Sequence, residues 1–502
     1  MRALEGIRVL DLSRVLAGPL CPMTLGDLGA DVWKVENPAH GDDTRTWLPP
    51  AAGGEATYYL SANRNKRSIA IDLKSQRGQE IVRAMALKAD VLVENMKLGT
   101  LDGMGLGWKH PQPLNPRLVY CSISGYGRHG PSAHLPGYDV IAQAESGLMA
   151  ITGEAGGRPL KHGVAIVDIV TGLNATQAIL AALYARERTG AGQFIDMALL
   201  DSGVAMLANT GAGFINAGVQ PPRWGNAHPT IVPYQVFAAA DGDFVLGCGN
   251  DHQFRALAGN VIGRPELATD PRYARNRDRV ANRGTLVPLL AGIFASEPAA
   301  HWLALLEKAG VPAGRVRDLD AVFSSPDAVA RETVRRQRHP TIGEVATIAS
   351  PLRLEGTPPT YVRPPPLLGQ HTRELLAEID GLRQRLKRFQ EENQANPQPI
   401  AAEFRLDAGF GSYQNIALLI EMGYEVYTKP HGNKTTQALR KQVDDSTTWT
   451  RVGANAEMVA WSNFKPKGCP YPLDMALERF YTGKTIKHSA LCHFGTDPVM
   501  QD

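Results

Sequence analysis

The sequence predicts an α/β fold with a Rossmann-like large domain, a smaller domain, and a C-terminal segment of a different style. Over the first ~200 residues, short apolar runs alternate with helix-like stretches, which is typical of a layered α/β fold. From Val164 onwards, two long stretches rich in Ala and Leu predict helices. Near Asp380 the pattern changes again, to a short coiled-coil-like stripe and then a new α/β segment.

The opening elements predict a βαβ unit. Arg8–Leu12 (RVLDL) predicts a strand, and a helix then runs to about Leu28, with Gly29 as its C-terminal cap. Asp31–Glu36 (DVWKVE) predicts the second strand. No GxGxxG motif follows the first strand, so the unit lacks the fingerprint of a dinucleotide-binding site.

The later elements extend this pattern. In chain order we expect strand Ser68–Leu73, helix Gln76–Ala89, strands Val91–Glu94 and Leu118–Ser124, helix Ile169–Arg188, strand Gly192–Met197 and helix Leu199–Phe214. The loop-like stretch Asn216–Pro233 is interpreted as a linker. It precedes the strand Phe244–Gly249, a small helical region to about residue 335, the extended stretch Pro340–Pro366 and a closing helix, Leu367–Glu378.

These elements divide the chain into four parts. Residues 1–215 form the first part of the large domain, 216–335 the linker and small domain, 336–380 a further segment, and 381–502 the C-terminal segment. Hydrophobic residues at spacings of four, three, four and three mark the joint: Leu375, Ile379, Leu382, Leu386 and Phe389. The change of style indicates a second module joined to a complete first one.

Composition excludes several classes of function. The net charge of +3 over 502 residues is too small for a nucleic-acid-coating surface. The start lacks the layout of a secretory signal and no apolar run spans a bilayer, so we expect a cytoplasmic protein without a membrane partner. Neither a disulfide framework nor a cysteine metal site is expected, because no CxxC pair occurs among Cys21, Cys121, Cys248, Cys469 and Cys492.

Asp168, in the segment GVAIVDIVTG just before a long apolar helix, is the most informative candidate. One interpretation is a helix N-cap, whose carboxylate accepts a backbone N–H, and position alone favours it. The other is a nucleophile. The helix dipole and the free N–H groups keep a carboxylate ionised there, and an exposed, ionised carboxylate can attack a thioester to form an anhydride.

Seven blocks decide between these interpretations because they occur in one order at specific spacings. They are ADVWKVENP, NRNKRSIAIDLK, LVENMKLGTLDGMGLGW, SISGYGRHGP, PGYDVIAQAESGLMAITG, the Asp168 segment and RTGAGQFIDMALLDS. Residues 1 to about 380 thereby resemble the family III CoA-transferases (CaiB/BaiF type), which include formyl-CoA and carnitine-CoA transferases. The resemblance implies a Rossmann-like large domain to which residues 336–380 return, a smaller α/β domain between linkers, and a homodimer of interlocked chains.

The resemblance also implies an acyl-CoA:carboxylate CoA-transferase with Asp168 as the nucleophile. Asp168 would form an anhydride with the acyl group, then a thioester with CoA, before the acceptor acid completes the exchange. The glycine turn with Gly247 and Gly249 would stabilise the oxyanions, because no side chain blocks its backbone N–H groups. The implied substrates are a CoA thioester and a small carboxylic acid, with no tightly bound cofactor and no metal.

Eight residues resemble the family's CoA contacts by their position in the matching blocks: Ile71, Lys74, Asn95, Met96, Lys97, Gly137, Tyr138 and Asp139. Lys74 and Lys97 are the expected phosphate partners, although each would otherwise be interpreted as a solvated surface lysine. In one departure, Gly103 stands where relatives often carry an arginine that touches CoA. That contact is therefore lost or replaced by Lys97.

An α-methylacyl-CoA racemase or epimerase is the alternative within CoA chemistry. Racemases resemble this chain at Asp168 but need a histidine where it has Tyr138, a poor base at neutral pH. His129 and His162 lie nearby in sequence, so a different geometry stays open. The residues GNDHQF after the glycine turn replace the glycine run of formyl-CoA transferases, which argues against oxalate. Relatives with this version are often succinyl-CoA-dependent transferases for dicarboxylates.

The C-terminal segment resembles a different family. FRLDAGFGSYQNIALLIEMGYEVYTKP resembles the middle of insertion-sequence DDE transposases, whose RNase H-like core holds two metals on two aspartates and a glutamate. Asp407 matches the second aspartate, but the other two carboxylates have no matching block, so no strand transfer is expected. A DNA-binding protein and an inactive transferase–transposase chimera are the remaining alternatives. A truncation after Glu378 is expected to be more soluble than the whole chain.

Overall fold

The chain divides into two compact units, one formed by residues 1–108 and 117–372 and the other by residues 109–116 and 373–502. The computed structural model describes residues 2–379, 404–406, 426–428, 441–444, 447, 450–453, 456–464, 473–482 and 485–494.

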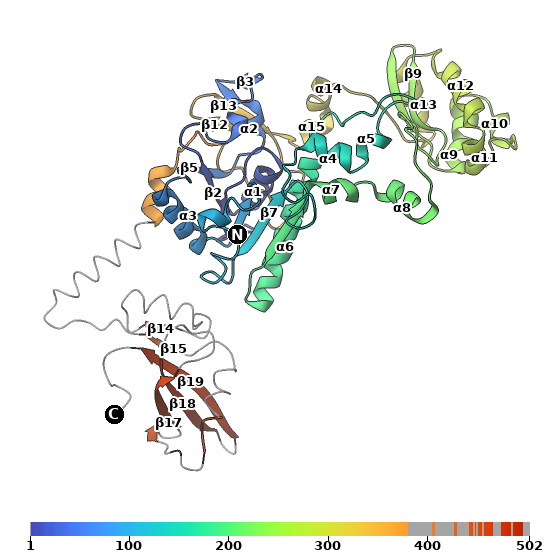
Figure 1. The fold of residues 1–502 in the computed structure, drawn as a ribbon. Helices are drawn as coiled ribbons and strands as arrows, with labels where there is room; N and C mark the ends of the chain where they lie inside the picture. Colours follow the sequence, from blue (N-terminus) through green and yellow to red (C-terminus); the bar gives the residue numbers. More distant parts are fainter. Residues whose placement is uncertain are drawn as a thin grey trace. The chain divides into compact units, whose positions relative to one another are not determined.

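A six-stranded parallel sheet is the centre of the first unit (Figure 1). Its strands in chain order are β1 (Arg8–Asp11), β2 (Asp31–Glu36), β5 (Lys66–Ala70), β6 (Val91–Glu94), β7 (Val119–Ser124) and β8 (Phe194–Ala198). They pair in the order β5-β2-β1-β6-β7-β8, and every pairing is parallel. This is the 3-2-1-4-5-6 order of a Rossmann-type sheet, in which the winding reverses between β1 and β6. The predicted α/β class with a parallel sheet is confirmed.

Two helices, α1 (Ala17–Asp27) and α6 (Ile166–Thr189), pack on each other and on this sheet. The stretch expected to form one helix after β8 forms two, α7 (Leu199–Ala205) and α8 (Ala208–Ala217), because the chain turns at Ala208, whose φ is 42°. The other elements are η1 (Asp43–Thr46), β3 (Ala51–Ala52), β4 (Glu55–Ala56), α2 (Thr57–Ser61), α3 (Gln76–Lys88), η2 (Asp102–Met104), α4 (Asp139–Glu145) and α5 (Leu148–Ile151).

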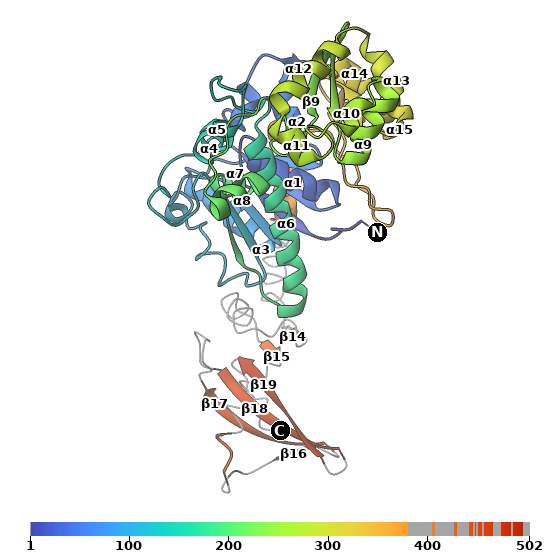
Figure 2. The same ribbon diagram turned by 90° about the vertical axis from the view of Figure 1, so that its right-hand side faces the viewer.

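The expectation that no apolar run is long enough to span a bilayer is wrong for the long helix α6 (Figure 2). By length and composition it could cross a membrane, and it is the one such helix among the described residues. Val167, Ala175 and Ile179 of this helix are fully buried in the main core. Its apolar character therefore serves packing against the sheet.

A second lobe of the first unit has its own sheet and core (Figure 1). Its strands β9 (Tyr234–Ala239), β10 (Gly242–Gly247) and β11 (Ala313–Arg315) pair antiparallel in the order β11-β10-β9. Phe294 anchors the core, with ring centroids 5.2 Å from both Phe244 and Trp302. The lobe is therefore α/β rather than helical; its helices are α9 (Asp251–Ala256), η3 (Leu257–Val261), α10 (Glu266–Thr269), α11 (Asn276–Ala281), α12 (Arg283–Phe294) and α13 (Ala299–Lys308).

The chain after this lobe runs back along the edge of the main sheet. The short helices α14 (Leu319–Phe323) and α15 (Pro326–Ala330) lead into a hairpin of β12 (Val334–His339) and β13 (Gly343–Ile348), where an extended stretch was expected. The backbone N–H of Asn65 then donates to Arg363 O, and that of His371 to Ser68 O, both at 2.9 Å. A helix over residues 372–379 follows, shorter than predicted.

In the second unit the described strands form a six-stranded sheet. They are β14 (Phe404–Leu406), β15 (Val426–Thr428), β16 (Thr450–Gly453), β17 (Ala456–Phe464), β18 (Leu473–Thr482) and β19 (Thr485–Phe494), in the order β14-β15-β19-β18-β17-β16. Only the β14–β15 pairing is parallel among them. Asp407, Leu382, Leu386 and Phe389 lie outside the described residues, so the RNase H-like fragment stays a prediction.

Candidate active site

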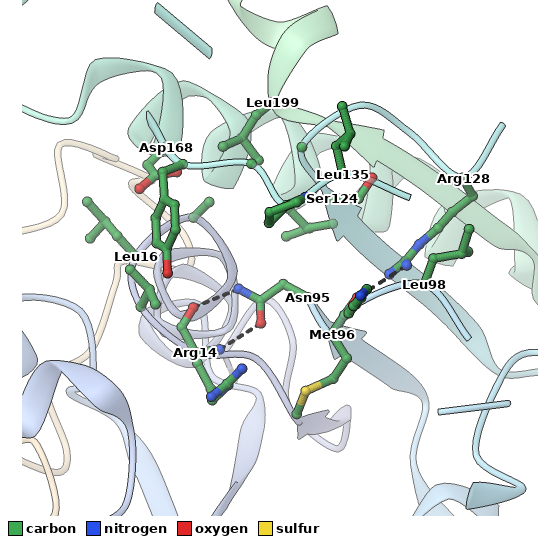
Figure 3. Close-up of a pocket in the computed structure, with 18 of the residues that line it drawn as sticks. Arg14, Leu16, Asn95, Met96, Leu98, Ser124, Arg128, Leu135, Asp168 and Leu199 are labelled. Carbon is green, nitrogen blue, oxygen red and sulfur yellow. Dashed lines mark hydrogen bonds between the residues drawn. The ribbon is translucent and has the colours of Figure 1, made fainter. Parts of the chain in front are cut away.

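A cavity of about 270 Å³ lies where the winding of the main sheet reverses (Figure 3). The loop after β1 contributes Arg14–Leu16, and the loop after the adjacent strand β6 contributes Asn95–Leu98. In open parallel sheets, ligands bind outside the carboxyl ends of the strands at this reversal. The remaining lining residues are Ala17, Asp43, Ile123, Ser124, Gly125, Arg128, Ala133, Leu135, Pro136, Gly137, Tyr138, Asp168 and Leu199.

The side chain of Asn95 joins the two loops. Its Oδ1 accepts a hydrogen bond from Arg14 N at 2.9 Å and its Nδ2 donates to Arg14 O at 2.7 Å, as Figure 3 shows. The next residue, Val15, has a φ of 73°, which is strained for a β-branched residue. Asp42 Oδ1 accepts the Val15 N–H at 3.3 Å and helps to hold this conformation. Asn95 therefore shapes the cavity wall through the backbone.

A buried network of charges supports the same loop. Lys34 Nζ lies 2.9 Å from Asp42 Oδ2 and donates to Ser13 O at 3.0 Å. Lys66 Nζ lies 2.9 Å from Asp11 Oδ2, and all four charged side chains have essentially no exposed surface. Burial alone would raise the pKa of Asp42, but Lys34 lowers it to about 2. Because unpaired charges in the core are very costly, each of these residues requires its partner.

Asp168 enters the cavity from the first turn of α6 and is 8% exposed. The N-cap interpretation is wrong, because the cap position is Ala165 and Asp168 is the third residue of the helix. Among the described residues no group donates a hydrogen bond to its carboxylate. Burial, and then the charge of Asp139, raise its pKa to about 7. The expected exposed and ionised carboxylate is thus a buried one that titrates near neutral pH.

Two glycines in the cavity wall touch each other. A Cβ atom on Gly137 would lie 2.3 Å from Gly125 Cα, and one on Gly125 would lie 2.6 Å from Gly137 Cα. Both clashes are with backbone, so neither can be relieved by rotating a side chain. The close approach brings the loop before α4 to the end of β7.

Gly137→Ala is expected to destabilise the chain by about 1–3 kcal/mol, because the backbone must separate to admit the methyl group. The control is Gly103→Ala, since a Cβ at Gly103 meets nothing within 4 Å and its φ is not positive. Thermal melting of both variants beside the parent chain measures the difference. Equal melting of Gly137→Ala and the parent would contradict the argument.

The other predicted CoA-contacting residues divide between two cavities. Asn95, Met96, Lys97, Gly137 and Tyr138 line the first cavity. A second, of about 320 Å³, is lined by Ile71 and Lys74 and shares Arg14 and Met96 with the first. Asp139 lines neither cavity. The two cavities therefore adjoin at the loops after β1 and β6, where an elongated ligand could occupy both.

The glycine turn of the second lobe lies apart from these residues and lines neither cavity. Its N–H groups are already used, since Gly247 N donates to Pro312 O at 2.9 Å and Gly249 N donates to Gln253 Oε1 at 2.8 Å. Asn250 begins α9 as its N-cap and accepts from Gln253 N. The oxyanion role of Gly247 and Gly249 stays a prediction and requires these donors to be released.

Sequence reasoning missed Arg14 and Arg128, two cations in the cavity wall. Arg128 bridges Glu94 and Ser122 with its guanidinium and lies within the SISGYGRHGP block, which could have drawn attention to it. Arg14 pairs with Asp43 at 3.0 Å and lies three residues after the end of β1, in the loop where parallel sheets place ligands. No histidine lines the first cavity. Among the described residues no group of three His, Cys, Asp or Glu could hold a metal ion.

Comparison with known proteins gives one consistent group of matches. The model of CoA-transferase family III matches residues 4–372. Succinyl-CoA:glutarate CoA-transferase from Mus musculus is 48% identical over 379 residues, which cover 76% of this chain and 87% of the relative. Acetyl-CoA:oxalate CoA-transferase from Acetobacter aceti is 42% identical over 361 residues, covering 72% and 91%. A solved CAIB/BAIF family protein from Brucella suis superimposes with a TM-score of 0.68 at 43% identity, covering 76% of this chain and all of that one.

Proposed function

The chain belongs to CoA-transferase family III, and from this premise we propose that it moves CoA from succinyl-CoA to a small dicarboxylic acid. The observation that carries the proposal is the carboxylate of Asp168, which lies in the cavity at the sheet reversal and accepts no hydrogen bond from the described residues. A pKa of about 7 makes it a base and nucleophile at physiological pH. The enzyme class, a CoA-transferase, rests on the family itself.

The reaction proceeds in four substitutions at carbonyl carbon. Asp168 attacks the donor thioester, the C–S bond breaks, and CoA leaves as a thiolate while an acyl-aspartyl anhydride forms. The thiolate attacks the aspartyl carbonyl, which releases the donor carboxylate and leaves an aspartyl-CoA thioester. The acceptor carboxylate attacks this thioester and again releases thiolate. Thiolate attack on the acceptor carbonyl of the new anhydride yields the product thioester and restores Asp168.

CoA is proposed to lie across both cavities, past the loop that contains Arg14. Lys74 in one cavity and Lys97 in the other offer ammonium groups to its phosphates. The reacting thioester would then lie in the first cavity beside Asp168. Tyr138, which is 60% exposed and lines this cavity, offers an aromatic surface to the substrate.

Glutarate is the first acceptor to test, because the mouse relative bears the name of a succinyl-CoA:glutarate enzyme. Oxalate is included because the Acetobacter relative is named for it, whereas the GNDHQF segment argues against it. Full-length protein is incubated with succinyl-CoA and each acid, and mass spectrometry follows new CoA thioesters. Glutaryl-CoA is the expected product. Succinyl-CoA that exchanges an α-hydrogen for deuterium without a new thioester would favour the racemase alternative.

The C-terminal segment is proposed to be a transposase fragment that contributes nothing to catalysis. The truncation after Glu378 is therefore expected to retain transfer activity and to be more soluble than the whole chain. The soluble fraction and kcat of the two forms are compared. An inactive truncated enzyme, or one of unchanged solubility, would contradict the prediction. If only the truncated form is active, the whole chain is the inactive chimera.

We propose a cytoplasmic homodimer. The apolar side chains of α8 support the dimer, because Phe214 is 51% exposed and Ile215 81%, and Val219 just beyond the helix is 62% exposed. Cys21, Cys121 and Cys248 are free and buried, which fits a reducing compartment. Light scattering of the purified protein would report the assembly.

A further inference from the structure

Asp139, in the first turn of α4, uses its carboxylate to hold the start of α6. Its Oδ1 accepts hydrogen bonds from the backbone N–H groups of Val167 at 2.8 Å and Asp168 at 3.2 Å. Ala165, at the N-cap position of α6, has no side chain that could do so. The first N–H groups of a helix have no partner within it, and here a carboxylate from another helix supplies one.

The carboxylate of Asp139 is itself fixed in place. Its Oδ2 accepts from Gln143 Nε2 at 2.6 Å, and Gln143 is buried. The Oε1 of the same glutamine accepts the N–H of His162 at 2.8 Å, in the segment that precedes α6. Both carboxylate oxygens of Asp139 are therefore engaged in aligning α4 with α6, and neither is directed to a cavity.

An aspartate in the first turn of a helix commonly binds the free N–H groups with its own carboxylate. At Asp168 those groups are already occupied by Asp139. We propose that Asp139 is a positioning residue for CoA transfer, which caps α6 from outside and so leaves the Asp168 carboxylate unbonded towards the thioester. The inference rests on the proposed role of Asp168 as the nucleophile.

The charge of Asp139 also affects the reactivity of Asp168, because it is the second cause, after burial, of the raised pKa of Asp168. The charges of Asp168 and Asp139 also act on Tyr58. Burial, followed by these two charges and that of Asp42, raises the pKa of Tyr58 to about 12, so it stays neutral near pH 7. The other charged groups of the cavity wall are Arg14, paired with Asp43, Arg128, paired with Glu94, and Lys97. A substitution that removes the charge of Asp139 should therefore lower the pKa of Asp168, and the rate of adduct formation as a function of pH measures that change.

The test uses full-length Asp139→Ala and Asp139→Asn, with Asp318→Ala as the matched control. Asp318 caps α14 (Leu319–Phe323) by accepting a hydrogen bond from Ala321 N at 2.8 Å. Its substitution therefore removes a helix cap that lies outside the cavity. The rate of adduct formation at Asp168 is measured across pH by hydroxylamine trapping and mass spectrometry after mixing with succinyl-CoA. Melting curves establish that each variant is folded.

Asp139→Ala is expected to form the adduct about tenfold or more slowly and to lose kcat rather than raise KM, while Asp318→Ala matches the parent. Asp139→Asn keeps an oxygen that can accept both N–H groups but loses the acceptor for Gln143 Nε2, so it should recover part of the rate and move the acid limb to lower pH by about half a unit or more. If Asp139→Ala does not fold, the pH profile of adduct formation in Asp139→Asn tests the positioning role instead.

Unchanged adduct rates in Asp139→Ala, or an unshifted profile in Asp139→Asn, would overturn the positioning role. The proposed function fails in a different way, through an Asp168→Ala variant that still transfers CoA. An inactive Asp168→Ala together with normal Asp139 variants therefore leaves the nucleophile in place and removes only the inference about its support.

Discussion

Asp168→Ala is expected to abolish CoA transfer, lowering kcat by about 10³-fold or more and removing the covalent adduct altogether. The reason is chemical: without the carboxylate neither the anhydride nor the aspartyl-CoA thioester can form. Among the residues that line the first cavity, the other carboxylate, that of Asp43, is paired with Arg14, and the neighbouring Asp139 is bonded to α6. Substrate binding should change little, so the loss appears in kcat.

Mass spectrometry of tryptic peptides after incubation with succinyl-CoA and hydroxylamine measures the adduct, and a coupled assay measures turnover. Asp201→Ala is a matched control, because Asp201 lies in the first turn of α7, is exposed and does not line the cavity. It should behave as the parent chain does. An Asp168→Ala enzyme with parental turnover, or an adduct on another peptide, would remove Asp168 from the mechanism.

Asp168→Asn is expected to inactivate the enzyme and at the same time to stabilise the fold. Burial and Asp139 raise the pKa of Asp168 to about 7 from its ordinary value of 3.8, so the folded chain accommodates the ionised form poorly. An amide of the same shape carries no charge to desolvate. The expected gain in the free energy of unfolding at pH 8 is roughly 2–4 kcal/mol.

The sign of the pH dependence follows from the same shift. Below about pH 4 the carboxyl is protonated in both the folded and the unfolded chain, so its ionisation does not lower the free energy of unfolding of the parent. Between about pH 4 and 7 the folded chain binds more protons than the unfolded chain, so the stability of the parent falls as pH rises. The advantage of Asp168→Asn should therefore be largest at pH 8 and shrink towards pH 5.

Calorimetric melting of both proteins at pH 8 and pH 5 measures this difference. Asp201→Asn is the control and should show no comparable gain, because its carboxylate is exposed. An equal gain at both pH values would attribute the effect to packing. No gain at either would mean that the carboxylate of Asp168 is solvated, and the pH dependence proposed for its nucleophilicity would fail with it.

Much of the fold could be predicted because the local sequence pattern marks the strands that are buried in the main sheet. Val91–Glu94 and Asp31–Glu36 were predicted with their observed bounds, since both are fully or nearly fully buried and rich in the β-branched and aromatic residues that favour strands. The hairpin of β12 and β13 was missed because β12 (VRRQRH) contains one apolar residue, Val334, and so carries little hydrophobic signal. The lobe strands β9 and β11 depend on their pairing with β10, which lies far from β11 in sequence.

The family, the α/β class and the candidate nucleophile Asp168 could be identified from the sequence, because ordered blocks and helix position are local properties of the chain. The protonation state of that carboxylate depends on contacts and burial that exist only in the folded chain. The carboxylate of Asp139 comes from 29 residues earlier in the chain, and its contact with α6 exists only when the two helices pack. Burial, too, is a property of the packed chain, so the sequence predicted an ionised carboxylate where folding produces one with a pKa of about 7.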